Sequence, residues 1–316
     1  MKWKVPYINF GRQFKKQEKL HLNKFKDIMN RGDFVLRGEV EKFEKTVSKY
    51  LGVKYVISVN SCTDAILLTL GSLGFKRGSE IISVAHTYVA TLSAIKHVAA
   101  KPVLADISND FNINPSSIER LITKKTKAIL PVHLYGHSCD MSPIMKIAKK
   151  HNLQVIEDGA QSFGAKYKGK FVGTFGKAGC FSLHPLKSLG AAGDGGFIVT
   201  NDKKLSESIR RLSTHGITKD ELLMSKRSAN EIWNYQQIQL GFNYRMNDIQ
   251  AALGISQLKR LDSYVSRRHE IASYYDLELT NLPITSPWQL PNTYSSYHLY
   301  PICIENDSNT KLQKKI

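Results

Sequence analysis

Three short polar segments each follow a predicted β-strand, and their residue types suit the binding of a charged ligand. Asn60–Thr63 stands directly before an apolar helix, where free backbone N–H groups and the positive end of the helix dipole favour phosphate. Asp158, within Glu157–Gln161, follows an apolar strand and offers a carboxylate to a ring nitrogen. Each segment also has a plain structural interpretation, because such residues are standard helix caps and turn residues.

The third segment, Phe181–Gly190, carries Lys187 and runs into the glycine-rich stretch 193–196. A lysine attacks a carbonyl group only as the free amine, so it needs a pocket that lowers its pKa from about 10.4. Pro185 and the following glycines suit a backbone that delivers one side chain to a fixed point. With 45 Lys and Arg in the chain, a single lysine is a surface residue by default, and only its position distinguishes Lys187.

The elements that must position these segments alternate between β-rich runs and helical patterns. The predicted strands are Tyr55–Val59, Glu80–Val84, Pro102–Asp106, Ala128–Val132 and Gln154–Glu157, and the predicted helices are Asp64–Leu73, Thr91–Ala99 and Ser142–His151. This alternation is typical of βαβ units and a mainly parallel sheet. Ligands of such sheets bind beyond the carboxyl ends of the strands, where the polar segments lie.

The alternation of strands and helices ends after the fifth predicted strand. Gly179–Leu183 and Gly196–Thr200 are predicted strands joined by a glycine-rich turn without a helix. Helices are predicted at Leu205–Leu212 and over one long stretch, Asn247–Leu279, and Tyr297–Ile304 is predicted as a strand.

Composition limits the function classes. The net charge of +18 favours anionic partners, but the basic residues do not alternate with aromatics, and no nucleic-acid motif is visible. The longest nearly apolar run, Ala65–Phe75, is too short to span a bilayer, and the first residues do not resemble a signal peptide. Four widely spaced cysteines predict neither disulfides nor a metal site. We therefore expect a cytoplasmic protein that binds neither nucleic acid nor membrane.

The order and spacing of the three segments resemble the DegT/StrS group of nucleotide-sugar aminotransferases. The resemblance runs from about Val5 to Tyr300. It implies the aspartate-aminotransferase fold (fold type I), with a three-layer, mainly parallel α/β domain at 1–250 and a smaller α+β domain at 251–316. It also implies the cofactor pyridoxal 5′-phosphate (PLP), no metal, and a homodimer with shared active sites.

The resemblance assigns roles to single residues. Lys187 would hold the cofactor and, once released, act as the catalytic base; Asp158 would pair with the pyridine nitrogen. The other implied contacts are Gln161 at the ring hydroxyl, Ser182, Cys62 and Thr63 at the phosphate, Tyr88 stacked on the ring, and Asn243 at the phosphate of the neighbouring subunit.

Alternatives from the residues alone stay open. Tyr88 also fits a core aromatic and Asn243 a helix cap, and His133 and His215 fit structural residues. A third histidine, His184, is near enough to Lys187 in sequence for us to consider a substrate role.

The resemblance implies transfer of an amino group from L-glutamate to a nucleotide-linked keto sugar. The turn at 189–196 is similar to that of members that aminate a 3-keto hexose, with a 4-keto sugar as the alternative. Three other functions remain as alternatives: a PLP sugar dehydratase, a non-catalytic regulatory protein and a basic nucleic-acid-binding protein. Dehydratases of this kind carry histidine in place of Lys187. Two departures concern Cys62, where relatives usually have glycine, and the residues after Tyr300. Relatives continue there with a His- and Pro-rich loop, so we expect either a shortened small domain or a truncated chain.

Overall fold

The central sheet of the protein has seven strands and is mainly parallel. The computed structural model describes residues 6–218 and 235–304. The strand order is β1 (Tyr55–Val59), β9 (Gly196–Thr200), β8 (Ala178–Ser182), β5 (Gln154–Asp158), β4 (Thr126–Ile129), β2 (Glu80–Val84) and β3 (Lys101–Ala105). All pairs from β8 to β3 are parallel, whereas β9 runs antiparallel to both its neighbours. A parallel pair needs a long crossover, so the helix-free connection between β8 and β9 accounts for that reversal.

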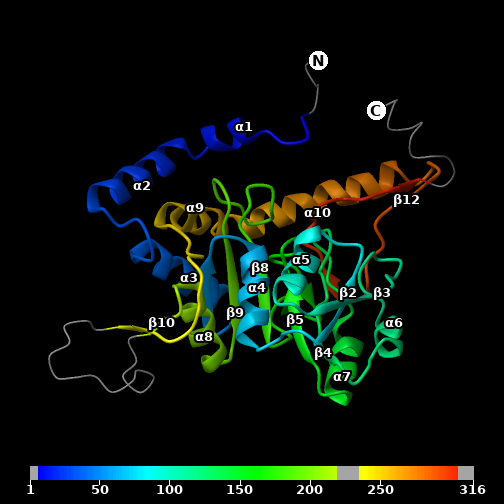
Figure 1. The fold of residues 1–316 in the computed structure, drawn as a ribbon. Coiled ribbons are helices and arrows are strands. Elements are labelled where there is room, and N and C mark those ends of the chain that lie inside the picture. Colours follow the sequence, from blue (N-terminus) through cyan, green and yellow to red (C-terminus); the bar gives the residue numbers. More distant parts are fainter. Residues whose placement is uncertain (1–5, 219–234, 305–316) are drawn as a thin grey trace.

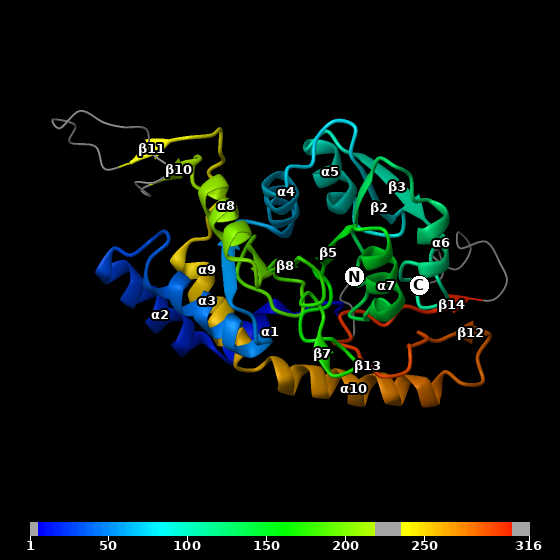
Figure 2. The same cartoon turned by 90° about the horizontal axis from the view of Figure 1, so that it is seen from below.

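Helices cover both faces of this sheet, as Figures 1 and 2 show. Neighbouring residues of one strand enter different hydrophobic clusters: Ile198 joins one, and Phe197 joins the other. The first cluster includes residues of α4 (Cys62–Ser72), α5 (Val89–His97) and α8 (Lys203–Ser213). The second includes residues of α3 (Gly38–Leu51), α9 (Asp248–Leu258) and α10 (Leu261–Glu278). The predicted three-layer α/β class is confirmed.

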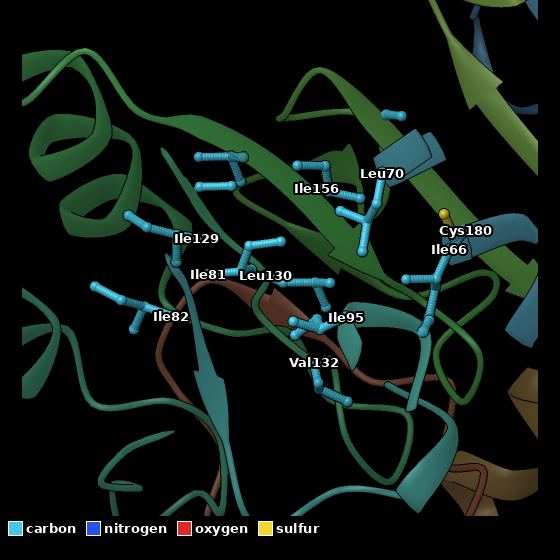
Figure 3. Close-up of a cluster of buried hydrophobic side chains, with 14 of the residues drawn as sticks. Ile66, Leu70, Ile81, Ile82, Ile95, Ile129, Leu130, Val132, Ile156 and Cys180 are labelled. Carbon is cyan, nitrogen blue, oxygen red and sulfur yellow. The ribbon is translucent and has the colours of Figure 1, made fainter. Parts of the chain in front are cut away.

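The first cluster forms the larger core. Figure 3 shows Ile66 and Leu70 of α4 beside Cys180 of β8. Cys180 and Leu70 are fully buried, and Ile66 is 1% exposed. This packing fixes the start of α4 relative to the end of β8, and both ends border the cavity described below.

The helical stretch predicted over Asn247–Leu279 is confirmed in α9 and α10 and is wrong only at 259–260, where the chain breaks between the two helices. Asn247 caps α9 by accepting from the N–H of Gln250, and α9 packs against α3. After the break, α10 runs along the edge of the molecule from α9 to β12 (Ile284–Thr285), as Figure 1 shows.

The predicted strand Tyr297–Ile304 is also wrong over most of its length. Only Cys303–Ile304 (β14) is a strand, and it pairs with β12. Tyr297 has a φ of 42°, in the left-handed region, which interrupts an extended chain. The segment instead binds the large sheet's loops: the Ser296 N–H donates to Gly136 O, and the Leu299 N–H donates to Tyr135 O.

The remaining elements are short or lie outside the sheet. They are α1 (Phe10–Lys15), α2 (Glu18–Arg31), α6 (Pro115–Arg120), α7 (Met141–Lys150), β6 (Lys166–Tyr167), β7 (Lys170–Phe171), β10 (Ile217–Thr218), β11 (Gln236–Gln237) and β13 (Thr293–Tyr294). The domain boundary at residue 250 stays a prediction; it falls within α9. No helix among the described residues is long and apolar enough to cross a membrane.

Candidate active site

The polar segments meet around one cavity of about 1300 Å³ at the carboxyl edge of the sheet. Its walls include eight residues singled out from the sequence: Cys62, Thr63, Tyr88, Asp158, Gln161, Ser182, His184 and Lys187. They lie at or shortly after the carboxyl ends of β1, β2, β5 and β8, with Cys62 and Thr63 in the first turn of α4. Parallel strands place their carboxyl ends at one edge, which brings together residues up to 125 positions apart.

A tight loop after β8 presents Lys187 to the cavity. The Lys187 N–H donates to His184 O at 2.8 Å, and the Ala191 N–H donates to Leu183 O at 2.8 Å. Gln250 of α9 then holds Ala192 by two hydrogen bonds of 2.9 Å, one to its N–H and one to its carbonyl. Burial lowers the pKa of Lys187 below its ordinary value, while the negative charge of Asp158 acts in the opposite direction. The loop therefore supplies an amine that loses its proton more easily than a surface lysine.

Asp158 lies at the end of β5 with both carboxylate oxygens hydrogen-bonded. Oδ2 accepts from the hydroxyl of Thr91 at 2.7 Å, and Oδ1 accepts from the Ala160 N–H at 3.0 Å. Burial raises the pKa of Asp158, and these two hydrogen bonds and the charge of Lys187 counteract it. The arrangement orients a carboxylate at the cavity wall.

The preceding residue, Glu157, faces the other side of the sheet. Its Oε2 accepts from the Gly173 N–H at 2.6 Å, and its Oε1 accepts from the N–H groups of Phe175 and Gly176, both at 2.7 Å. His133 completes the set: its Nδ1 accepts from the Cys139 N–H, so its Nε2–H donates to Glu157 at 3.0 Å. Glu157 and His133 are thus structural residues that hold the 173–176 turn.

The start of α4 has the features of an anion-binding site. Ser61 caps the helix by accepting from the Asp64 N–H at 3.1 Å, and Cys62 and Thr63 follow in the first turn. A Cβ added to Gly196 would lie 2.4 Å from the Ser61 carbonyl carbon, so only glycine lets β9 approach this turn. Burial raises the pKa of the Cys62 thiol, which keeps it uncharged. The backbone N–H groups and the helix dipole therefore provide the attraction for an anion.

Gln161 and Tyr88 complete the walls predicted from the sequence. The Gln161 Oε1 accepts from the Tyr135 N–H at 2.9 Å, which leaves the amide NH₂ as the donor toward the cavity. Tyr88 is 71% exposed at the start of α5 and lines the cavity, so it is not a core aromatic.

Asn243 does not lie with the other predicted residues. It forms a β-bridge with Thr214, and its neighbours Phe242 and Tyr244 bond to the backbone of α8. It is absent from the cavity wall of its own chain.

The cavity residues that were not predicted from the sequence include two basic side chains from the C-terminal part. Arg268 lies on α10, and His298 lies in the segment bound to Gly136. Burial, followed by the charges of Lys187 and Arg268, lowers the pKa of His298 to about 3. No motif marks either residue, and the adjacent pair Arg267 and Arg268 looks like ordinary surface charge.

The donor set fits PLP. A lysine with a lowered pKa, a buried and oriented carboxylate and a helix start approached by glycine match the cofactor's aldehyde, ring nitrogen and phosphate. Among residues 6–218 and 235–304, no group of three His, Cys, Asp or Glu side chains could hold a metal ion.

Comparison with known proteins gives a consistent result. The model of the DegT/DnrJ/EryC1/StrS aminotransferase family matches residues 15–316. The chain is 36% identical over 289 residues to UDP-2-acetamido-2-deoxy-3-oxo-D-glucuronate aminotransferase of Pseudomonas aeruginosa, covering 91% of this chain and 77% of that protein. It is 39% identical over 270 residues to GDP-perosamine synthase of Escherichia coli O157:H7, covering 84% and 69%.

A solved structure agrees in fold. The crystal structure of S. venezuelae DesV, in complex with a ketimine intermediate, superposes with a TM-score of 0.89 at 33% identity. The match covers 98% of this chain and 80% of that one.

Proposed function

Because the chain belongs to the DegT/DnrJ/EryC1/StrS aminotransferase family, whose members use PLP, we propose that it moves an amino group from L-glutamate to a nucleotide-linked 3-keto hexose. The observation that carries the proposal is the placement of Lys187 and Asp158 on one cavity wall, each influencing the other's pKa. When bound, PLP supplies the electron sink for the bonds that change at the amino-bearing carbon.

We assign the chain's own residues the following roles. Lys187 Nζ holds the cofactor and then carries a proton to and from the reacting carbon, for which a lowered pKa is suited. Asp158 keeps a proton on the ring nitrogen through its oriented carboxylate. Cys62 and Thr63 bind phosphate through backbone N–H groups, Ser182 binds it through its hydroxyl, Gln161 donates to the ring hydroxyl, and Tyr88 covers the ring face.

The choice of a 3-keto acceptor is supported by the turn at 189–196 and by the 3-oxo substrate in the name of the Pseudomonas relative. The nucleotide stays open, since the two relatives described above are named for UDP- and GDP-linked sugars.

The first experiment records the absorbance spectrum of the protein with PLP, before and after L-glutamate. We expect a visible band that glutamate bleaches and that a nucleotide-linked 3-keto sugar restores. A 4-keto sugar that restores it faster would reverse the choice of acceptor, and a band that ignores glutamate would favour the dehydratase. No band at all would remove the catalytic interpretation.

We further propose a homodimer in which Asn243 completes the partner's site. Its position outside the cavity of its own chain supports this, as does the exposure of Leu240 (90%) and Tyr88 (71%). Mixing Lys187→Ala and Asn243→Ala subunits tests it. Shared sites predict that the mixture regains activity that neither variant has alone, whereas separate sites predict none.

We also propose a cytoplasmic location. The support is the set of unpaired cysteines among the described residues, three of them buried. Cell fractionation with an antibody to the protein tests it, and recovery outside the cytoplasm would contradict it.

A further inference from the structure

Arg268 presents a guanidinium group to the cavity. It lies on the same face of α10 as Ile271, Ala272 and Tyr275, at spacings of three, four and seven residues, and all four line the cavity. Burial lowers the pKa of Arg268, so much of its solvent shell has been lost. An arginine in such a position needs hydrogen-bond acceptors.

The backbone, and not a carboxylate, holds Arg268 in place. Its Nη1 donates to the carbonyl of Ser296 at 3.2 Å, and the Ser296 N–H in turn donates to Gly136 O at 2.8 Å. The neighbouring His269 bonds to the Ser295 carbonyl at 2.7 Å. α10 and the 295–296 segment therefore fix the guanidinium while leaving further N–H donors for the cavity.

No carboxylate of the described residues forms an ion pair with Arg268. Three of the four acidic side chains of α10 are engaged elsewhere: Glu270 with Arg267, Asp262 with the Tyr50 hydroxyl, and Asp276 with the Tyr300 hydroxyl. The exposed Arg267 thus has a carboxylate partner, whereas the more buried Arg268 has no carboxylate partner within the part of the chain described.

The groups near Arg268 in the cavity do not neutralise the positive charge of its guanidinium. Lys187 and Arg268 both act on His298, so the three groups lie near one another. With its pKa at about 3, His298 is neutral near pH 7 and adds no charge. Asp158 interacts with Lys187 and has both oxygens bonded, and Arg268 is not among the charges that act on it. The part of the cavity next to Arg268 and Lys187 therefore attracts an anion.

We propose that Arg268 binds a carboxylate group of a substrate in the cavity. The planar fork of a guanidinium matches a carboxylate in two-point contact, and a carboxylate would supply the partner that Arg268 lacks. This inference rests on the proposed function, which offers two sources of the carboxylate: the amino donor L-glutamate, or an acceptor sugar of the hexuronate class. The relative from Pseudomonas is named for a glucuronate substrate.

The test measures binding of maleate, an unreactive dicarboxylate, to the PLP-loaded protein by calorimetry. We expect Arg268→Met to raise the Kd about tenfold or more, the usual scale for loss of charge-assisted hydrogen bonds. Arg268→Lys keeps the charge without the fork and should give an intermediate Kd. Arg267→Met is the matched control, because it removes the adjacent, exposed arginine, and its Kd should stay unchanged. An unchanged Kd in Arg268→Met or Arg268→Lys, or no maleate binding by the unmodified protein, overturns the proposal.

Single-turnover kinetics then separate the two sources. If the donor carboxylate binds here, Arg268→Met slows bleaching by L-glutamate and leaves restoration by a keto sugar unchanged. If the sugar carboxylate binds here, the variant slows restoration by a 3-keto hexuronate but not by a neutral 3-keto hexose. Failure of the unmodified protein to aminate any keto sugar would refute the proposed function, while the maleate measurement would still judge Arg268.

Discussion

The hydroxyl of Thr91 donates a 2.7 Å hydrogen bond to Oδ2 of Asp158, and both side chains are buried. Thr91 Oγ1 also lies 2.9 Å from Thr87 Oγ1. Burial alone would favour the protonated acid, so a donor to the ionised form stabilises the carboxylate that the proposed pairing with the ring nitrogen requires. Thr91 is therefore a positioning residue for Asp158.

Replacing Thr91 with valine keeps the shape and removes the donor. A hydrogen bond to a charged group contributes about 1.5–3 kcal/mol, so we expect bleaching by L-glutamate to slow about tenfold or more. The pH titration of the visible band should shift as well, because Asp158 becomes easier to protonate. Thr91→Ser restores the hydroxyl and should recover both properties; a Thr91→Val spectrum with an unchanged pH profile would contradict this role.

Attachment of PLP to Lys187 should depend on pH. Only the free amine reacts, and the fraction of Lys187 in that form rises as pH approaches its pKa. Burial lowers this pKa, so the free amine forms at a lower pH than in an ordinary lysine. The rate of appearance of the visible band should thus rise with pH and level off below the ordinary lysine value of 10.5. Lys187→Ala should show no such band and no turnover. Lys203→Ala, on the exposed start of α8, is the control and should behave like the unmodified protein.

His298 should make the folded protein sensitive to acid. Its pKa is about 3 in the folded state against 6.5 ordinarily, so the unfolded chain binds more protons between these values. The contribution of His298 to stability is therefore complete above pH 6.5 and is lost as pH falls toward 3. We expect His298→Gln to weaken the fall in Tm between pH 6.5 and pH 4, measured by thermal melts. A parallel fall in both proteins would refute the assignment.

Gly159 should resist even a methyl group. A Cβ there would lie 2.5 Å from Cε1 of Phe181, and one at Gly173 would lie 2.3 Å from Cζ of the same ring. The Phe181 ring is fully buried between Gly159 and Gly173, so it cannot move away from a methyl group at Gly159 without approaching Gly173. Gly159→Ala should destabilise the fold by about 1–3 kcal/mol, as overpacking does. Denaturant unfolding measures this, and a second change, Phe181→Leu, should recover part of the loss if the clash is the cause.

Much of the sheet could be predicted because strand signals are local. The bounds of β1, β2 and β9 match the predicted ones, and residues that follow the carboxyl ends of β1 and β2 line the cavity. The break before α10 was not predictable from helix-breaking residues, since neither glycine nor proline stands at 259–260.

Partners distant in sequence explain the site residues that were missed. Thr91 stands 67 residues before Asp158, and Arg268 stands 28 residues before Ser296. Only the folded chain brings these groups together. Periodicity and motif spacing carry no information about such contacts, which is why motifs could suggest candidate cofactor residues but not Thr91 or Arg268.

Glu157 and Asp158 point to opposite faces of the sheet, so the function of β5 depends on the exact number of residues that precede them. Side chains alternate along a strand, so adding or deleting one codon upstream would exchange the two carboxylates between faces. Asp158 would then face the side of the 173–176 turn, and Glu157 would face the side of the cavity. A single in-frame indel would thus affect folding and chemistry together, whereas a change of two codons would preserve the alternation but move Asp158 by about 7 Å along the strand. For the gene, the number of codons in this strand is therefore constrained both by the face and by the position that Asp158 must occupy.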